Sequence, residues 1–291
     1  MGVFDQAARY AARAEPGPVL RHVLGEGVRQ EGWFDTRPLP MPGGAEREPD
    51  LVPDIEDGEG RALLLLEFQA QHDPEKLDIT LLEAATLRVY ARHGEVKDLK
   101  YRVGAALVYL KGECPDPVLL MAVSGKGTLH ECHVWNVCRS KARDALDMVE
   151  AGAVSWGELF WVPLMEGGTD EDVVRRWADL VGRLAPTPEA KAALRGIALV
   201  FAELAGKVPE WRRVMGATLV TESEVVNEWM DMVRLESAKK HLRRVIQVRL
   251  PDAWTPDVEK AIADQPSLEL LEAWDEAALA AESPQAFLDA L

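Results

Sequence analysis

The sequence has little cysteine, no long apolar run and a shortage of basic side chains. Three cysteines in 291 residues exclude a disulfide framework and favour a reducing, cytoplasmic setting. No apolar stretch approaches the roughly 18 residues of a membrane helix. The first residues lack the basic and apolar regions of a signal peptide. We therefore expect a cytoplasmic protein with no membrane partner.

The charge balance excludes a second class of protein. Lys and Arg total 33 and Asp and Glu total 49, which gives a formal net charge of −16. A protein that coats nucleic acid through a globally basic surface is therefore excluded. The apolar share of 47% and the charged share of 28% are ordinary for a globular chain. At roughly 150 residues per domain, the length predicts about one or two domains.

The first part of the chain, residues 1–140, alternates helical and strand patterns. Short apolar segments at 50–56 and 62–69 flank a polar turn and predict a β-hairpin. Asp73 and Pro74 are typical of a helix start, and apolar spacing continues that helix to about residue 92. We expect an α/β (α+β) core with further strands at 103–110, 118–123 and 130–137.

The second part, residues 141–291, is mostly helical in pattern. Thr187-Pro188 and Thr255-Pro256 pair a capping residue with a proline suited to the first helical turn. Residues 251–291 hold ten acidic side chains against one lysine, so the chain ends in an acidic tail. We expect a helical extension that packs on the core.

Two carboxylates flank the predicted hairpin. Glu67 ends an apolar run, where an ionised carboxylate costs free energy unless it is paired or bound to a cation. Strand pairing would bring Asp50 to Glu67, or Asp54 if the register is shifted. We expect these carboxylates about 4–5 Å apart, within reach of one metal ion. Carboxylate oxygens suit Mg²⁺, which can polarise a phosphodiester and activate a water molecule.

The order of these residues resembles the PD-(D/E)XK nuclease superfamily. Within it, the sequence is most similar to the recombination-promoting nucleases, which are also described as transposase-like. The resemblance spans about residues 4–112 and implies a restriction-endonuclease-like core, followed here by the helical C-terminal extension. The matching segments are Pro49-Asp50, Leu66-Glu67-Phe68-Gln69, the helical residues Arg88 and Tyr90, and Val108-Tyr109-Leu110-Lys111-Gly112.

The resemblance implies a Mg²⁺-dependent DNA endonuclease linked to recombination or mobile DNA, with Mn²⁺ as an alternative metal. Asp50 and Glu67 would bind the metal, with the Phe68 carbonyl as a third ligand. Gln69 takes the place of the lysine of the wider superfamily. A neutral amide can orient water but supplies no positive charge, so a lysine from elsewhere could serve. Two further acids, Glu15 and Glu26, are candidates for an additional helical carboxylate.

A basic stretch near this site is a candidate DNA contact. Residues 88–111 carry a net charge of +4, and residues 231–250 carry the same excess. Either run could be an ordinary solvated face or a track for phosphates. A carboxylate pair repels DNA, so positive charge beside it has to offset that repulsion. The residues expected to form this basic rim are Arg88, Arg92, Lys97, Lys100 and Arg102.

Three other interpretations compete with an active nuclease. Glu67 could be a structural carboxylate paired with an arginine such as Arg88. The run from His130 to Cys138 holds possible zinc ligands, although their spacing is not that of paired zinc knuckles. The net charge and Gln69 favour a catalytically inactive nuclease fold that serves as an interaction protein. A homo-oligomer is compatible with any of these.

Overall fold

The computed structural model describes residues 2–34, 39–40, 46–47, 49–93, 102–114, 116–215, 224–281 and 283–288. The chain forms two compact units, Met1–Glu222 and Ser223–Leu291. The helices that follow residue 140 therefore belong, as far as residue 215, to the same unit as the sheet. The division expected at 140/141 falls about 80 residues later. Among the described residues, no helix is both long enough and apolar enough to span a membrane.

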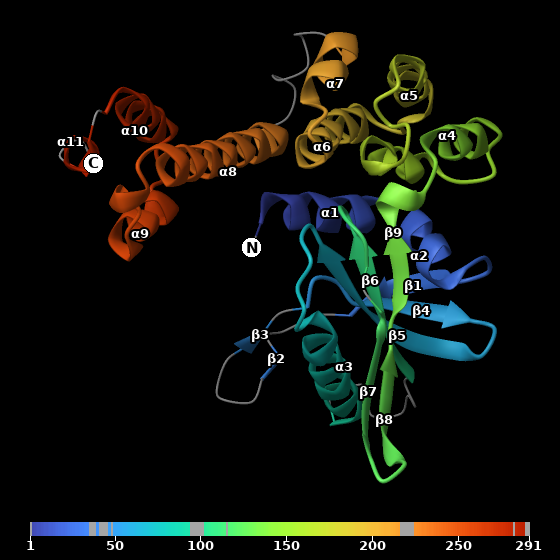
Figure 1. The fold of residues 1–291 in the computed structure, drawn as a ribbon. Helices are drawn as coiled ribbons and strands as arrows, with labels where there is room; N and C mark the ends of the chain where they lie inside the picture. Colours follow the sequence, from blue (N-terminus) through green and yellow to red (C-terminus); the bar gives the residue numbers. More distant parts are fainter. Residues whose placement is uncertain are drawn as a thin grey trace. The chain divides into compact units, whose positions relative to one another are not determined.

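The first unit is built on a five-stranded mixed sheet (Figure 1). Its first three strands are antiparallel neighbours and its last three are parallel neighbours. The expected hairpin is confirmed: Asp54 lies opposite Leu63 across the antiparallel pair. In spatial order the strands are β1 (Arg29–Trp33), β4 (Pro53–Asp57), β5 (Gly60–Gln69), β6 (Arg102–Tyr109) and β9 (His133–Asn136).

The central strand β5 is buried on both faces because it has neighbours on both edges and cover on both sides. Leu63 and Leu65 point to one face, where they join a cluster with Leu87 of helix α3 (Lys76–His93). Phe68 points to the opposite face and stacks on Trp161. The continuous apolar run of β5 is thus the pattern of a strand covered on both faces.

Helix α3 connects β5 to the parallel strand β6, so it crosses the sheet as a βαβ unit requires. The expected start is confirmed. The Asp73 carboxylate accepts a hydrogen bond from the Glu75 N–H at 2.9 Å, and the helix begins at Lys76. This start places the Lys76 side chain beside the carboxyl end of β5, where it contacts Glu67, nine residues earlier in the chain.

Helix α1 (Val3–Ala14) packs against β5 and against helix α6 (Pro188–Ala205). It buries a stripe of small residues: Ala7, Ala8, Ala11 and Ala12. Its C-terminal end fits closely against a short 3₁₀ helix, η2 (Trp156–Phe160). A Cβ atom at Gly157 would lie only 2.0 Å from Cγ of Glu15. Glycine is therefore required for α1 to approach η2 at this distance.

Further helices complete the first unit and bury its large aromatic side chains. Trp161 and Trp177 are fully buried, and Trp177 donates a hydrogen bond to the Leu159 carbonyl. The other helices among the described residues of this unit are α2 (Gly17–Leu24), η1 (Val137–Arg139), α4 (Ala142–Glu150), η3 (Val162–Leu164), α5 (Glu171–Leu184), α6 (Pro188–Ala205) and α7 (Val208–Met215).

Two short strand pairs lie outside the main sheet. The segment expected as one strand at 130–137 is divided at Cys132, so that only β9 joins the central sheet. The residues before Cys132 pair instead with the strand at Val118, as a separate antiparallel hairpin. The additional strands are β2 (Leu39–Pro40), β3 (Glu46–Arg47), β7 (Val118–Val123) and β8 (Lys126–Glu131).

The second unit is helical and holds its own apolar core, which includes Leu242, Ile246, Leu271 and Phe287. Part of the basic run at 231–250 has a structural use here: Lys239 donates to the Ala263 carbonyl and Arg249 to the Leu279 carbonyl, near two helix ends. The helices are α8 (Glu224–Arg249), η5 (Pro251–Ala253), α9 (Pro256–Asp264), α10 (Leu268–Ala280) and α11 (Pro284–Leu288).

Candidate functional site

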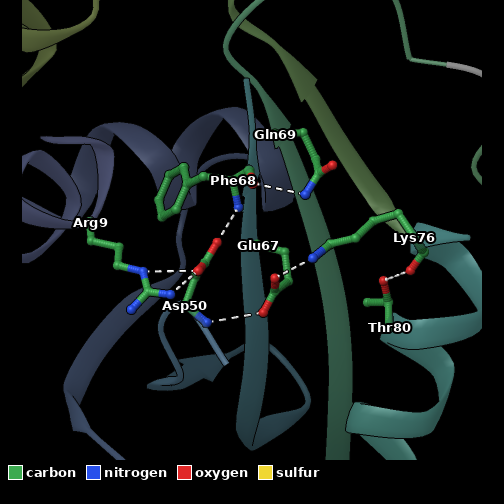
Figure 2. Close-up of polar contacts among 7 residues, drawn as sticks. All are labelled: Arg9, Asp50, Glu67, Phe68, Gln69, Lys76 and Thr80. Carbon is green, nitrogen blue, oxygen red and sulfur yellow. Dashed lines mark hydrogen bonds and ion pairs between the residues drawn. The ribbon is translucent and has the colours of Figure 1, made fainter. Parts of the chain in front are cut away.

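Asp50 and Glu67 meet at the carboxyl end of β5 (Figure 2). An isolated antiparallel bridge between Leu51 and Leu66 brings the two segments together. The Asp50 N–H donates to Oε1 of Glu67 at 3.0 Å, and Oδ2 of Asp50 accepts from the Phe68 N–H at 2.8 Å. Each carboxylate thus accepts a backbone N–H from the other segment, while the expected spacing of about 4–5 Å between the two carboxylates stays a prediction. The sheet edge at the ends of parallel strands is a common place for ligand sites.

Each carboxylate is paired with a basic side chain from a different helix. Arg9 of α1 donates from both Nε and Nη2 to Oδ1 of Asp50, with the Nε contact at 2.9 Å. Nζ of Lys76, in α3, donates a hydrogen bond to Oε2 of Glu67 at 2.5 Å. All four carboxylate oxygens thus accept a hydrogen bond from a protein donor. The site is an alternating cluster of two anions and two cations.

The position of Lys76 runs against the helix dipole. It is the first residue of α3 and only 8% exposed, and a positive charge at a helix N-terminus is disfavoured. Burial works against its charge, yet the Glu67 carboxylate and the nearby Asp50 and Glu83 raise the pKa of Lys76 above its usual value. Lys76 therefore stays charged here because carboxylates surround it.

Burial, and then the charge of a neighbouring acid, raise the pKa values of two carboxyl groups in this cluster. Burial, and then the charge of Asp50, raise the pKa of Glu67, while the Lys76 ammonium acts in the opposite direction. Burial and Asp50 also raise the pKa of Asp5, which lies on α1 one turn before Arg9. Asp5, Asp50 and Glu67 thus share one electrostatic environment. A bound cation would favour the charged form of each acid.

Gln69 and the Phe68 carbonyl lie beside the carboxylates but contact each other. The Gln69 amide donates to the Phe68 carbonyl at 2.9 Å. Residues 67 and 69 belong to one face of β5, as strand geometry requires. The Phe68 oxygen, expected as a third metal ligand, is therefore already a hydrogen-bond acceptor. Gln69 supplies no positive charge to the site, whereas Lys76 of α3 does.

The donor set fits a hydrated magnesium ion better than a closed metal cage. Within the described ranges, no group of three or more His, Cys, Asp or Glu side chains is arranged to hold a metal. Asp50 and Glu67 supply hard oxygen ligands, and two cationic groups already occupy oxygens that a metal would use. Mg²⁺ commonly binds through one or two carboxylates and keeps several waters. Such an ion could bind here once one of the two cationic groups moves from its carboxylate oxygen.

The expected basic rim is only partly described, and Arg102 is not in it. Arg102 pairs with Asp57 and Glu59 at the amino end of β5, and it lies opposite Ala62. At about 3.3 Å per residue, that is roughly 16 Å along the strand from Glu67. Arg88 is exposed on α3. The side chain of Arg92, together with Lys97 and Lys100, lies outside the described residues.

The alternative acids lie elsewhere. Asp54 pairs with Arg61 on the neighbouring strand and does not contact Glu67.

Glu15 lies at the far end of α1 from Asp5, and with Glu26 it lines a separate cavity of about 220 Å³. Of the α1 acids, Asp5 is the one whose pKa responds to Asp50. Arg88 is likewise not the partner of Glu67, because Lys76 takes that place.

The possible zinc ligands do not form a cluster. His130 Nε2 lies 3.3 Å from the sulfur of Cys132. Cys138 instead donates to the Leu110 carbonyl. Burial raises the pKa of the Cys132 thiol to about 12, which disfavours the thiolate that zinc requires. Together with the metal finding for the described residues, this gives the zinc interpretation no support.

Three members of the cluster were not identified from the sequence: Asp5, Arg9 and Lys76. The sequence contains only a weak indication of each, in the helical spacing of Asp5 and Arg9 and in the place of Lys76 at a helix start. Asp5 and Arg9 are spaced i, i+4 beside an alanine stripe, which places both next to the buried face of the helix. Lys76 follows directly on a helix start, where a basic residue is unfavourable unless anions lie nearby.

Comparisons with protein-family models, with curated proteins and with solved structures gave no match. The site therefore has to be interpreted from its own geometry and charges.

Proposed function

We propose that the protein is a Mg²⁺-dependent phosphodiester hydrolase acting on DNA. The observation that carries this proposal is the convergence of Asp50, Glu67 and Lys76 at the carboxyl end of β5. The resemblance to recombination-promoting nucleases adds the expectation of an endonuclease with a restriction-endonuclease-like core. A mixed sheet with helices on both faces is compatible with that core.

In this proposal the two carboxylates hold the metal and Lys76 supplies positive charge. When bound, Mg²⁺ would polarise a phosphodiester oxygen and lower the pKa of a coordinated water. Asp50 and Glu67 provide its protein ligands. Lys76, held at the Glu67 carboxylate, would stabilise negative charge that develops on the phosphoryl group. Gln69 would fix the Phe68 carbonyl or orient a water molecule through its amide.

The direct test is cleavage of supercoiled plasmid DNA by the full chain with Mg²⁺ and with EDTA. We expect nicking with Mg²⁺, none with EDTA, and none for Glu67→Ala. Gln69→Ala should lose roughly 10²-fold in rate, as is typical for one positioned group. Glu56→Ala, an exposed carboxylate on the neighbouring strand, is the matched control and should cleave like the parent. Equal rates for the parent and Glu67→Ala would contradict the proposal.

A second function, that of a catalytically inactive interaction protein, is favoured by the hydrogen bonds of the cluster and by the net charge. Each oxygen of the two carboxylates already has a protein hydrogen-bond donor, so the cluster is satisfied without a metal. The net charge of −16 points the same way. In that case neither Mg²⁺ nor Mn²⁺ would bind, and no DNA would be cleaved. Calorimetric titration with either ion separates the two functions.

A further inference from the structure

Arg9 occupies the oxygen of Asp50 that a bound cation would use. Its Nε and Nη2 atoms both donate to Oδ1, whereas Oδ2 accepts the Phe68 N–H at 2.8 Å. A carboxylate oxygen accepts through about two lone-pair directions, and two guanidinium donors already use Oδ1. In this arrangement Oδ1 has no lone pair left for a metal. Oδ2 is held by the backbone of β5.

We propose that Arg9 and a divalent cation compete for Oδ1 of Asp50, and that Arg9 leaves this oxygen when the cation binds. The inference rests on the proposed function, which assigns Asp50 to the cation. It adds a positioning residue that controls metal affinity in this protein. In the metal-free state Arg9 neutralises Asp50 and fixes its orientation. In the metal-bound state the cation takes over both tasks.

The surroundings favour Arg9, rather than Lys76, as the group that moves. The side chains of Arg9 and Asp50 are 16% and 11% exposed, so a released guanidinium can reach water. The side chains of Lys76 and Glu67 are 10% and 5% exposed, so an ammonium released from Glu67 would stay buried away from water. Displacement of Lys76 is therefore the costlier route.

Asp5 gives the released guanidinium a second partner. It lies one turn before Arg9 on α1, and residues spaced i, i+4 are neighbours on a helix surface. The two side chains already interact, because the Arg9 charge offsets part of the rise in the pKa of Asp5. Arg9 can thus exchange Asp50 for Asp5 without a change in the backbone of α1.

The test is the affinity of the full chain for Mn²⁺ and Mg²⁺, measured by calorimetry without DNA. Removal of a competing group tightens binding by the coupling between the two ligands, for which about tenfold is typical. We expect Arg9→Met to bind Mn²⁺ about tenfold more tightly than the parent. Arg13→Met removes the same charge from an exposed position on the same helix and should bind like the parent. Titrations in about 0.5 M salt screen long-range attraction but leave direct competition in place.

A second readout follows the guanidinium itself. In ¹H–¹⁵N spectra, the Nε–H of Arg9 should be protected from solvent exchange in the metal-free protein. Mg²⁺ should remove that protection in the parent, and it should leave the Lys76–Glu67 contact intact. This measurement needs no variant, so it remains decisive if Arg9→Met does not fold.

The outcomes separate this inference from the proposed function. If Arg9→Met and the parent bind Mn²⁺ equally, or if Arg9 stays protected in saturating Mg²⁺, competition is wrong and the hydrolase proposal stands. If neither protein binds either ion, both proposals fall. If Asp50→Asn binds Mn²⁺ as well as the parent does, the metal lies elsewhere, and the assignment of Asp50 is wrong in both.

Discussion

The two ends of β5 carry the same kinds of charge in different surroundings. At the carboxyl end, Glu67 and Lys76 are 4% and 8% exposed. At the amino end, Arg102 pairs with Asp57 and Glu59 among largely exposed side chains. Hydrogen bonding to Arg102 lowers the pKa of Asp57, whereas burial raises that of Glu67 in spite of Lys76. Desolvation, rather than pairing, therefore decides whether the pKa of a carboxyl group at either end of β5 rises or falls.

The largest effect should come from removing one partner at the buried end. Lys76→Met leaves Glu67 buried without its cation, and loss of one member of a buried pair costs about 3–5 kcal/mol. We expect a loss of this size in the free energy of unfolding, measured by urea denaturation at neutral pH. A loss below about 1 kcal/mol would mean that Lys76 and Glu67 do not form a buried pair.

A second change should recover part of that loss. Combining Lys76→Met with Glu67→Gln removes the unpaired charge, while the amide oxygen can still accept the Asp50 N–H. Coupling between contacting residues is typically about 0.5–3 kcal/mol, so the double variant should be more stable than Lys76→Met alone. Urea denaturation of all four proteins gives the coupling energy. Simple additivity of the two changes would contradict a direct interaction.

The pH dependence of stability should report the coupling among the acids at the carboxyl end of β5. A carboxyl group with a raised pKa holds its proton better in the folded state, so its contribution to stability falls as the pH rises above about 4.5. Asp50→Asn removes a charge that raises the pKa values of Glu67 and Asp5. We therefore expect Asp50→Asn to gain stability relative to the parent as the pH rises through this range. Unfolding curves from about pH 4 to 7 measure the difference, and parallel curves would refute the coupling.

The smallest effect is expected at the exposed end. Arg102→Met removes the partner of Asp57 and Glu59, but water can solvate both acids once the arginine is gone. The urea midpoint should change little, and any change should shrink further as salt is added. A loss comparable to that of Lys76→Met would show that burial does not separate the two ends.

The sequence predicts the strand pairing around the site better than the basic side chains that pair with its carboxylates. Two short apolar segments around a polar turn were enough to pair Asp50 with Glu67, because strand alternation and a short hairpin restrict the register. Arg9 could not be assigned in the same way. It lies 41 residues from Asp50, and which helix face packs on which strand is a tertiary property that local pattern does not encode.

The domain boundary and the second basic run were difficult for the same reason. Helical spacing after residue 140 predicts helices, but it does not say whose core they join, and several pack into the first unit. The excess of basic residues at 231–250 includes Lys239 and Arg249, which donate to carbonyls near helix ends. Charge counting along a chain cannot distinguish such contacts from a nucleic-acid track.

The close fit of Glu15 against Gly157 has a consequence for genetics. Any side chain at residue 157 would overlap the stem of Glu15 and push α1 away from η2, and α1 carries both Asp5 and Arg9. A substitution 148 positions from Arg9 in the chain can thus impair the cluster without touching it. Such a defect should be suppressible in the same gene: a Gly157→Ala allele would be rescued by Glu15→Gly, which vacates the space the new methyl group needs.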